Sequence, residues 1–227
     1  MMGQNFVSIE GNIGSGKSSI LRVIAERMPE LAILEEPLAS WEKAGPNGDV
    51  NLLALYYDNP QRWGFTFQIY AFMTRLMRWT EFNKVEDQRV RVSERSLLSD
   101  RHVFAAIMKD MGILNEVEYL MYSDCYENLK KMQKIADLKG AIYVKCEPEI
   151  CSHRIKKRAR EGESTIPLDY LAKLHQKHEE WLNSPTQSQI GQGEEVEDLK
   201  VLVIDNTEPI DPEAVVERVR KWLEEMK

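Results

Sequence analysis

A segment near the N-terminus carries the residue types that bind nucleotide phosphates. Between Gly11 and Ser18 it reads GNIGSGKS, which satisfies the pattern G-x-x-x-x-G-K-[ST]. Its glycines let backbone N–H groups approach phosphate oxygens, Lys17 reaches the outer phosphates, and the Ser18 hydroxyl binds Mg²⁺. The motif follows a β-favouring run and opens a helix-patterned stretch, 18–28, whose dipole favours an anion. It predicts a phosphate-binding loop (P-loop); the alternative is a glycine-rich turn without a ligand.

A P-loop by itself leaves transferases, GTPases and motor ATPases open, and a second cluster of charge narrows the choice. Arg154 and Arg158 are four residues apart and share one face of a predicted helix, with Arg160 at its end. The guanidinium fork of arginine matches the oxygens of a phosphoryl group in transit. The alternative is a solvated helix face that pairs with Glu161 and Glu163.

Acidic residues follow two of the predicted strands. Glu35 and Glu36 come after one strand-like run, and Glu94 with Arg95 comes after another. In a P-loop protein the carboxyl ends of the parallel strands line the ligand crevice. One carboxylate there can accept the proton of an attacking hydroxyl, and another can hold Mg²⁺ directly or through water. In the alternative interpretation these acids cap the helices that follow.

A parallel sheet would bring these side chains to one edge. The sequence has five β-favouring runs, at 5–10, 32–34, 89–93, 141–146 and 200–204. Helix-patterned stretches lie between and after them, at 18–28, 60–84, 97–109, 115–136, 148–160, 167–182 and 211–227. Strands that alternate with helices predict an α/β fold with helices on both faces of the sheet. Residues 42–49 and 183–198 are predicted loops.

Length and composition exclude several other classes of protein. The chain has 227 residues, 43% of them hydrophobic, which predicts a single domain, 1–227, with a buried core. Its net charge of −7 repels nucleic acid and anionic membranes, so neither is expected as a partner. Three irregularly spaced cysteines fit neither a disulfide framework nor a zinc site. The first residues lack a signal-peptide pattern, and no apolar run reaches the ~18 residues of a membrane span, so we expect a cytoplasmic protein.

The order of the motifs resembles the deoxynucleoside kinase family, which includes deoxycytidine, deoxyguanosine and deoxyadenosine kinases. The resemblance runs from residue 6 to about 182, and more weakly to the C-terminus. It rests on EGNI at 10–13, EP at 36–37 with Trp41, RW at 62–63 leading into FTFQIY at 65–70, ERS at 94–96 with SDR at 99–101, HRIKKRAR at 153–160, IPL at 166–168, LH at 174–175 and KHE at 177–179. These motifs are more specific than the P-loop alone.

The resemblance implies a P-loop nucleoside-kinase fold, with a five-stranded parallel sheet flanked by helices and an arginine-rich lid at about 154–165. It also implies a homodimer that uses ATP and Mg²⁺ and transfers the γ-phosphoryl group to the 5′-hydroxyl of a deoxynucleoside in nucleotide salvage. One alternative is a catalytically silent nucleotide-binding structural subunit of the same fold, which the presence of Lys17, Glu36, Arg95 and Arg158 opposes. A second alternative is a nucleoside-monophosphate kinase, which Glu36 at the acceptor end opposes.

The resemblance also implies a role for each matching residue. Glu36 resembles the base at the 5′-hydroxyl, Arg95 the cation beside the phosphoryl group, and Glu94 with Ser18 the Mg²⁺ ligands. The implied catalytic residues are Lys17, Glu36, Arg95, Arg154, Arg158 and Arg160. The implied nucleotide-binding residues are Gly11, Asn12, Ile13, Gly14, Ser15, Gly16, Lys17, Ser18, Ser19, Arg154 and Arg158. The implied substrate-binding residues are Glu36 and Arg95, then Tyr57 and Glu163 at the 3′-hydroxyl, Gln68, Arg75 and Asp100 at the base edge, and Trp41, Phe67 and Phe104 as aromatic walls.

Elementary chemistry agrees with the implied base-edge residues. Gln68 and Arg75 are seven residues apart and so lie on one face of the predicted helix 60–84. A carboxylate such as Asp100 accepts hydrogen bonds from the amino group of cytosine or adenine, whereas thymine presents a carbonyl oxygen and a methyl group. Because buried charges need partners, we expect Arg75 to pair with Asp100, and thymidine to be a poor substrate. Met73 and Met77 are expected in the core.

Overall fold

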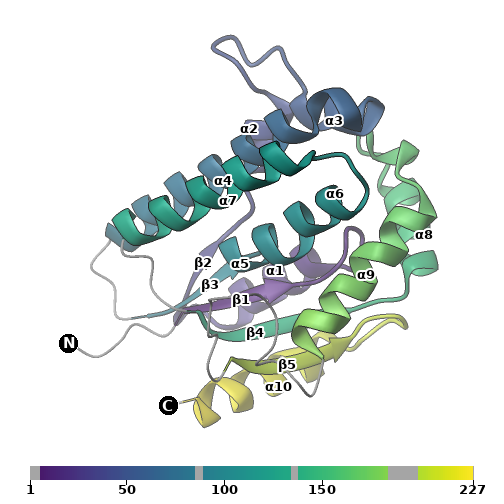
Figure 1. Ribbon diagram of the computed structural model, residues 1–227. Helices are drawn as coiled ribbons and strands as arrows, with labels where there is room; N and C mark the ends of the chain where they lie inside the picture. Colours follow the sequence, from purple (N-terminus) through teal and green to yellow (C-terminus); the bar gives the residue numbers. More distant parts are fainter. Residues whose placement is uncertain (1–5, 85–88, 134–137, 184–198, 227) are drawn as a thin grey trace.

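Five strands form one parallel sheet in the part of the chain that the computed structural model describes, residues 6–84, 89–133, 138–183 and 199–226. They are β1 Phe6–Glu10, β2 Leu31–Leu34, β3 Val90–Glu94, β4 Leu138–Lys145 and β5 Lys200–Asp205. Their order is β2-β3-β1-β4-β5, and each neighbouring pair is parallel (Figure 1). The five predicted strand runs are therefore confirmed, with ends that shift by at most three residues.

The central position of β1 places the P-loop in the middle of the carboxyl edge. Val7 and Ile9 are buried on one face of the sheet and Phe6 on the other, which is the pattern of a strand covered on both sides. From β1 the chain passes to β2 on one side of the sheet, and from β3 it crosses to β4 on the other. A ligand crevice forms outside the strand ends where connections diverge in this way.

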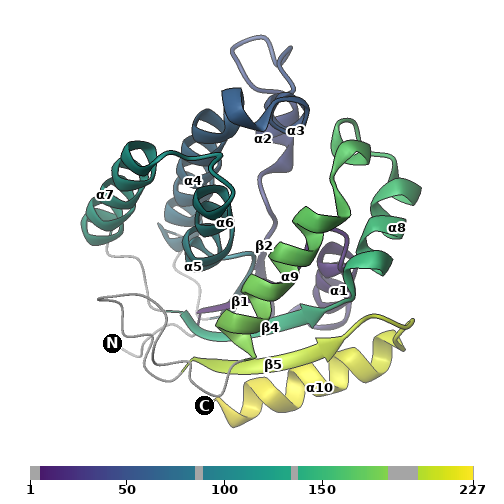
Figure 2. The same cartoon turned by 45° about the vertical axis from the view of Figure 1, so that its right-hand side comes forward.

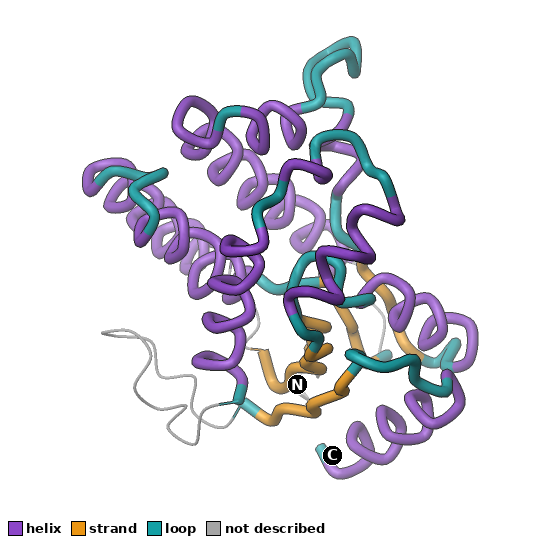
Figure 3. Tube along the Cα trace, turned by 90° about the vertical axis from the view of Figure 1, so that its right-hand side faces the viewer, coloured by secondary structure: helices purple, strands orange, loops and turns teal. Residues whose placement is uncertain are grey.

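Helices cover both faces of the sheet, as Figures 1 and 3 show. The described helices are α1 Lys17–Arg27, α2 Leu38–Glu42, α3 Leu52–Asp58, α4 Pro60–Lys84, α5 Leu97–Ser99, the π-helix η1 Asp100–Ala105, α6 Ala106–Asp110, α7 Glu116–Gln133, α8 Pro148–Arg158, the 3₁₀-helix η2 Glu163–Thr165, α9 Leu168–Leu182 and α10 Pro212–Glu225. α1 and α10 pack on the face that contains Val7 and Ile9. α4, η1, α6 and α9 contribute to the core on the opposite face.

Two predicted helices differ from the structure in ways that affect the site. The stretch 97–109 is not one α-helix, because a π-helical segment begins at Asp100 between α5 and α6. α8 ends at Arg158 rather than at residue 160, because Ala159 adopts a left-handed conformation with φ 53°. Arg160 therefore follows the helix. The short helices α2 and α3 have no counterpart among the sequence predictions, and the predicted loop 183–198 lies outside the described residues except for Asn183.

The long helices α4 and α7 pack side by side at the edge of the molecule (Figure 1). Phe72 on α4 and Tyr122 and Tyr126 on α7 are buried between them. Outside this contact, large apolar side chains remain exposed on both helices: Met77 (62%), Val117 (65%), Leu120 (59%) and Met121 (53%). The prediction that Met77 belongs to the core is wrong, whereas Met73 does pack against the buried cluster. We refer to these four exposed side chains as the α4/α7 apolar face.

Candidate active site

The P-loop has the backbone conformation that its glycines permit. Gly14 and Gly16 have φ values of 80° and 95°, in the left-handed region that side chains disfavour. Space is also limited, since a Cβ at Gly14 would lie 2.6 Å from the Cys151 carbonyl oxygen and one at Gly11 would lie 2.4 Å from the Val144 carbonyl oxygen. Gly16 directly precedes α1, so the loop leads into a helix N-terminus, which favours an anion.

Lys17 is held inside the P-loop by main-chain oxygens. Its Nζ donates to the carbonyl oxygens of Gly11 at 3.1 Å and Asn12 at 2.7 Å, and the residue is 5% exposed. Burial, and then the nearby Arg95 cation, lower the pKa of Lys17 to about 7. A phosphate anion at this position would stabilise the charged form.

Ser18 and Glu94 meet where a cation would bridge to a phosphate. The Ser18 hydroxyl, in the first turn of α1, donates to Glu94 Oε1 at 2.6 Å, and Glu94 ends β3. The described residues contain no cluster of three or more His, Cys, Asp or Glu side chains that could hold a metal by themselves. Mg²⁺ commonly takes one or two protein oxygens and completes its shell with phosphate oxygens and water. The Ser18–Glu94 pair fits such a site.

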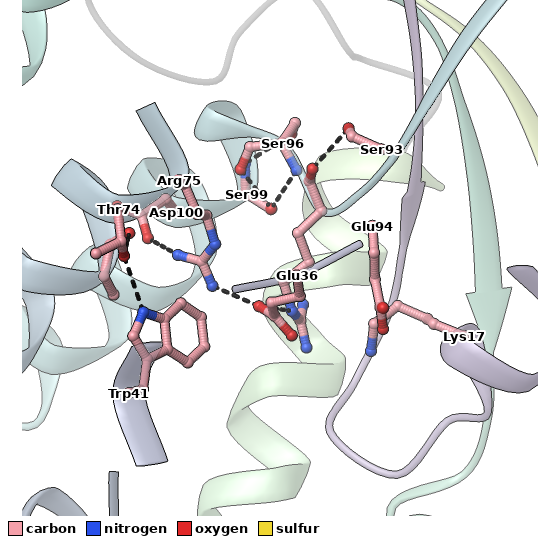
Figure 4. A network of polar contacts seen from close by, with 12 residues as sticks. Lys17, Glu36, Trp41, Thr74, Arg75, Ser93, Glu94, Ser96, Ser99 and Asp100 are labelled. Atoms are coloured by element: carbon pink, nitrogen blue, oxygen red, sulfur yellow. Dashed lines mark hydrogen bonds and ion pairs between the residues drawn. The ribbon is translucent and has the colours of Figure 1, made fainter. Parts of the chain in front are cut away.

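A buried ion-pair network joins Glu36 to the end of β3 (Figure 4). Arg75 Nη2 donates to Glu36 Oε1 at 2.6 Å, and the same arginine pairs through Nη1 with Asp100. Arg95 Nε lies 3.2 Å from Glu36 Oε1, and Arg95 Nη1 donates to the Gly11 carbonyl oxygen at 2.9 Å. Burial raises the pKa of Glu36, but Arg95 and Arg75 outweigh it and bring the pKa below its ordinary value. The carboxylate is therefore ionised at neutral pH and able to accept a proton.

Arg95 is held in a strained backbone conformation. Its φ is 64°, which costs on the order of 1–3 kcal/mol for a residue with a side chain. Ser93 Oγ donates to the Arg95 carbonyl oxygen at 2.8 Å, and Ser96 begins α5 with a capping box completed by Ser99 (Figure 4). These bonds on both sides of Arg95 hold its guanidinium between Glu36 and the P-loop.

Asp100 is bound by three side chains from two helices, α4 and α7. Gln68 Nε2 on α4 and the Tyr122 hydroxyl on α7 each donate to Asp100 Oδ2 at 2.9 Å, and Arg75 pairs with the other oxygen. The expected pairing of Arg75 with Asp100 is therefore present. Tyr122 was not identified from the sequence, because it lies on a separate helix 22 residues from Asp100.

Aromatic rings line the cavity beside this network. Trp41 meets Phe67 edge-on with centroids 5.5 Å apart, and its Nε1 donates to Thr74 Oγ1 at 2.9 Å. Phe104 lies against Arg95, with 4.5 Å between the guanidinium carbon and the ring centroid. The cavity brings together residues of the P-loop, of α4 and η1, and of the arginine-rich segment. Its lining includes Lys17, Glu36, Trp41, Tyr57, Phe67, Gln68, Arg75, Glu94, Arg95, Asp100, Phe104, Arg158, Arg160 and Glu163.

The end of α8 and the segment after it contribute charged side chains to the lining of this cavity. Arg158 donates to Glu163 Oε2 from Nε at 3.1 Å and from Nη2 at 2.5 Å, and Arg160 Nη1 donates to Oε1 at 2.8 Å. Arg160 Nε also lies 3.1 Å from Glu42 Oε1 at the end of α2. Figure 2 shows α8 and α9 side by side, with the segment that joins them facing α3. Movement of this segment as a lid stays a prediction.

Of the three arginines in the predicted cluster, Arg154 lies apart from Arg158 and Arg160. Arg154 Nη1 donates to the Ser15 carbonyl oxygen at 3.4 Å and to Cys146 Sγ at 3.3 Å, and Arg154 is not among the residues that line the cavity. A groove next to it is lined by Gly16, Ser19 and residues after β5, including Asn206 and Ile210.

Comparisons with known proteins agree with this geometry. The sequence model of the family described as deoxynucleoside kinase matches residues 7–225. Deoxycytidine kinase 2 of Gallus gallus is 33% identical over 96% of this chain and 89% of its own length. The mitochondrial deoxyguanosine kinase of Xenopus laevis is 36% identical over 79% of this chain and 74% of its own length, and the deoxycytidine kinase of Homo sapiens is 33% identical over 96% and 90%.

The chain belongs to the deoxynucleoside kinase family. As a deoxynucleoside kinase it is a phosphotransferase of nucleoside salvage, and the five-stranded parallel sheet expected from the resemblance is confirmed. None of its described helices is both long and apolar enough to span a membrane.

Local sequence patterns do not predict two residues of this site, Tyr122 and Tyr170, but they do predict a third, Asn206. Tyr122 lies on a helix with no motif around it, and Tyr170 lies between the motifs IPL at 166–168 and LH at 174–175 but belongs to neither. Tyr170 forms a 3.3 Å hydrogen bond with the Tyr56 hydroxyl. Asn206 directly follows β5, and its Nδ2 donates to the Ser15 carbonyl oxygen at 2.7 Å. The rule that polar residues after parallel strands line the crevice, already applied to Glu36 and Glu94, would have identified Asn206.

Proposed function

We propose that this kinase transfers the γ-phosphoryl group of ATP to the 5′-hydroxyl of deoxycytidine, deoxyadenosine or deoxyguanosine, in preference to thymidine. The observation that carries the proposal is the position of Glu36. Its ionised carboxylate touches both Arg75, which pairs with the base-edge acid Asp100, and Arg95, which contacts the P-loop. An acceptor whose base lies at Asp100 would place its sugar hydroxyl between Glu36 and the P-loop.

Glu36 would accept the proton of the attacking 5′-hydroxyl. A general base must be ionised and within hydrogen-bond reach of that proton. Arg95 and Arg75 keep Glu36 ionised, and Arg95 is fixed by its strained backbone at the junction of acceptor and P-loop. There it would stabilise charge on the transferred group, which is the main contribution of protein side chains to phosphoryl transfer.

The donor would bind along the P-loop. Backbone N–H groups of residues 11–18 and Lys17 would hold the phosphates, and the base would occupy the groove that Ser19, Asn206 and Ile210 line. Ser18 and Glu94 would hold Mg²⁺, which neutralises phosphate charge when bound. Arg154 lies at the start of this path, close enough to meet the phosphates.

Glu163 would connect the acceptor to the lid arginines. It is 2% exposed and accepts hydrogen bonds from both Arg158 and Arg160, while it shares a cavity with Tyr57. A sugar 3′-hydroxyl that donates to Glu163 would orient the carboxylate that positions the two arginines. Arginines supplied from a closing segment also protect the donor from attack by water.

The base end of the cavity supports the choice of acceptor. Gln68 offers a carbonyl oxygen and an amide, and Asp100 is an acceptor for an exocyclic amino group. Arg75, bound to both Asp100 and Glu36, occupies space that the thymine methyl group would need. The deoxycytidine and deoxyguanosine kinases among the relatives have acceptors of the proposed class.

We also propose that the kinase is a homodimer joined through the α4/α7 apolar face. Four large apolar side chains exposed on two adjacent helices are typical of an interaction surface. Two copies related by a two-fold axis would cover the same residues on each chain. A cytoplasmic location and the absence of a nucleic-acid partner stay predictions.

Coupled measurement of ADP release tests the proposed reaction. The full chain is incubated with ATP, Mg²⁺ and each of the four natural deoxynucleosides at equal concentration. We expect ADP release that depends on deoxycytidine, deoxyadenosine or deoxyguanosine, with little for thymidine and little without an acceptor. Release that depends on a nucleoside monophosphate, or that is greatest with thymidine, would contradict the proposed acceptor.

A further inference from the structure

Two cysteines form a pair beside the P-loop that the proposed reaction does not use. Cys146 directly follows β4, and Cys151 lies in the first turn of α8. Both residues are buried, with exposures of 1% and 0%, and each side chain shifts the pKa of the other. Cys151 Sγ also lies 3.7 Å from the Cys146 carbonyl oxygen, to which its thiol donates. The third cysteine, Cys125, lies far away on α7 and is exposed.

The surroundings make the two sulfurs chemically unequal. Arg154 Nη1 donates to Cys146 Sγ at 3.3 Å. The Cys151 thiol and, after it, Arg154 lower the pKa of Cys146, whereas the contact with Cys146 and burial raise the pKa of Cys151. Because the thiolate is the reactive form of cysteine, Cys146 is the sulfur that attacks, and Cys151 is a neighbouring thiol able to resolve the product.

The same residues support the phosphate-binding loop. Arg154 Nη1 also contacts the Ser15 carbonyl oxygen at 3.4 Å. A Cβ at Gly14 would lie only 2.6 Å from the Cys151 carbonyl oxygen, so the P-loop backbone rests against the first turn of α8. A covalent bond that draws Cys151 toward the end of β4 would shift the surface beneath Gly14. It would also replace the Cys146 sulfur that accepts from Arg154 with the neutral sulfur of a disulfide.

We propose that Cys146 and Cys151 form an oxidation site, at which a peroxide closes a disulfide that weakens binding of the phosphate donor. The Cys146 thiolate attacks one oxygen of hydrogen peroxide, the O–O bond breaks, and hydroxide leaves to give a sulfenic acid. The Cys151 sulfur then attacks the Cys146 sulfur, its proton passes to the departing hydroxide, and water is released. The hydroxide released in the first step takes up the proton that Cys146 lost on ionising. In total the two thiols lose two electrons, one peroxide gains them, and two waters form. The effect on the donor rests on the proposed function, whereas the disulfide does not.

Mass mapping tests whether the disulfide forms, and ATP binding tests separately whether the disulfide weakens binding of the donor. The full chain is reduced, freed of reductant, treated with hydrogen peroxide and alkylated with N-ethylmaleimide. Peptide mapping is expected to find a Cys146–Cys151 disulfide that dithiothreitol reverses. By titration calorimetry, oxidation is expected to weaken ATP binding by about fivefold or more, the lower range of site-to-site coupling, and to leave deoxynucleoside binding unchanged. MgATP added before peroxide is expected to slow disulfide formation, because Arg154 would then turn to the phosphates.

Matched variants separate this site from general oxidative damage. Cys146→Ala and Cys151→Ala should each abolish both the disulfide and the change in ATP binding, whereas Cys125→Ser should keep both. Each variant is compared with its own reduced form, so that altered packing does not imitate the effect. Complete alkylation of both thiols after peroxide would overturn the oxidation site, and a disulfide that leaves ATP binding unchanged would overturn its coupling to the donor. A chain that phosphorylates no deoxynucleoside would overturn the proposed function, but it would not affect the evidence from peptide mapping for the Cys146–Cys151 disulfide.

Discussion

At Glu36, two arginine contacts produce an ionised carboxylate that remains a proton acceptor at neutral pH. Replacing Glu36 with Gln keeps an oxygen that accepts from Arg75 but removes the basic site. Glu36→Gln is therefore expected to lower kcat by about 10²–10⁴-fold, the usual contribution of a positioned general base. Steady-state kinetics should show little change in the KM of ATP. Glu35→Gln, the exposed neighbouring acid, is the matched control, and near-normal turnover of Glu36→Gln would disprove the assignment.

Lys17 gives the donor site a pH dependence. Its pKa of about 7 is lower than the ordinary value of 10.5, so the free enzyme is charged there below pH 7 and mostly neutral above it. A bound phosphate anion favours the charged form, so ATP binding at pH 8 should take up roughly one proton at this residue. ATP affinity should consequently fall as the pH rises above 7. Calorimetry in buffers of different ionisation enthalpy measures the uptake, and an equal uptake in Lys17→Met would assign it to another group.

Arg75 and Asp100 are expected to govern which base the enzyme accepts. Arg75→Met combined with Asp100→Ala removes both charges and opens space for a methyl group. The double variant should shift the ratio of kcat/KM for deoxycytidine to that for thymidine toward thymidine by about tenfold or more, since a good bidentate contact discriminates by ~1–3 kcal/mol. Asp100→Ala alone should mainly damage the pocket, because Gln68 and Tyr122 lose their acceptor. An unchanged ratio in the double variant would place the base elsewhere.

At the scale of elements, the α8–η2 segment combines a helix end with two arginines on one carboxylate. α8 stops at Arg158 because Ala159 turns left-handed, and this turn places Arg160 against Glu163 and Glu42. Arg158→Ala should lower kcat by about 10²-fold or more and raise the KM of ATP, because its charge would meet the group in transfer. Lys157→Ala, which removes an exposed charge from the same helix, should have little effect. Unchanged kinetics in Arg158→Ala would indicate that the arginine cluster is a solvated helix face without a role in the reaction.

The π-helix η1 shows how an element can redirect functional side chains. An α-helix through 97–109 would place Asp100 and Phe104 one turn apart on the same side. Instead the wider π turn begins at Asp100, which reaches Gln68 and Tyr122 while Phe104 lies against Arg95. Single π turns inside helices are frequent at functional sites. Hydrophobic periodicity does not distinguish them from α-helix, which is why the sequence predicted one continuous helix.

At the scale of the whole molecule, the α4/α7 apolar face predicts the assembly state. Leu120→Glu or Met121→Glu places a charge in an interface that would otherwise be apolar, so each should convert a dimer to a monomer in sedimentation-velocity experiments. A stable dimer would need to bury an interface of the standard size, roughly 1,600 Å² in total. Leu168→Glu changes an exposed leucine on α9 and is the control. A parent chain that sediments as a monomer would contradict the proposed homodimer.

The sequence determined those features that depend on neighbours along the chain. Five strands, the main helices and the P-loop follow from local patterns: apolar runs, helical spacing, and glycines followed by Lys17 and Ser18. The positions of Glu36 and Glu94 after strands also predicted their place at one edge, because parallel strands present their carboxyl ends together. Family resemblance added a proposed role for each residue, but not the contacts that would carry it out.

Only the tertiary structure decided which distant side chains meet. Arg75 binds Glu36 as well as Asp100, Tyr122 donates to Asp100 from another helix, and Arg154 is separated from Arg158 and lies beside Cys146. These contacts join residues brought together by the packing of helices on a sheet, and no periodicity along the chain encodes such a distance. The left-handed turn at Ala159 and the π turn at Asp100 are likewise conformations that the surrounding packing selects, against local preference.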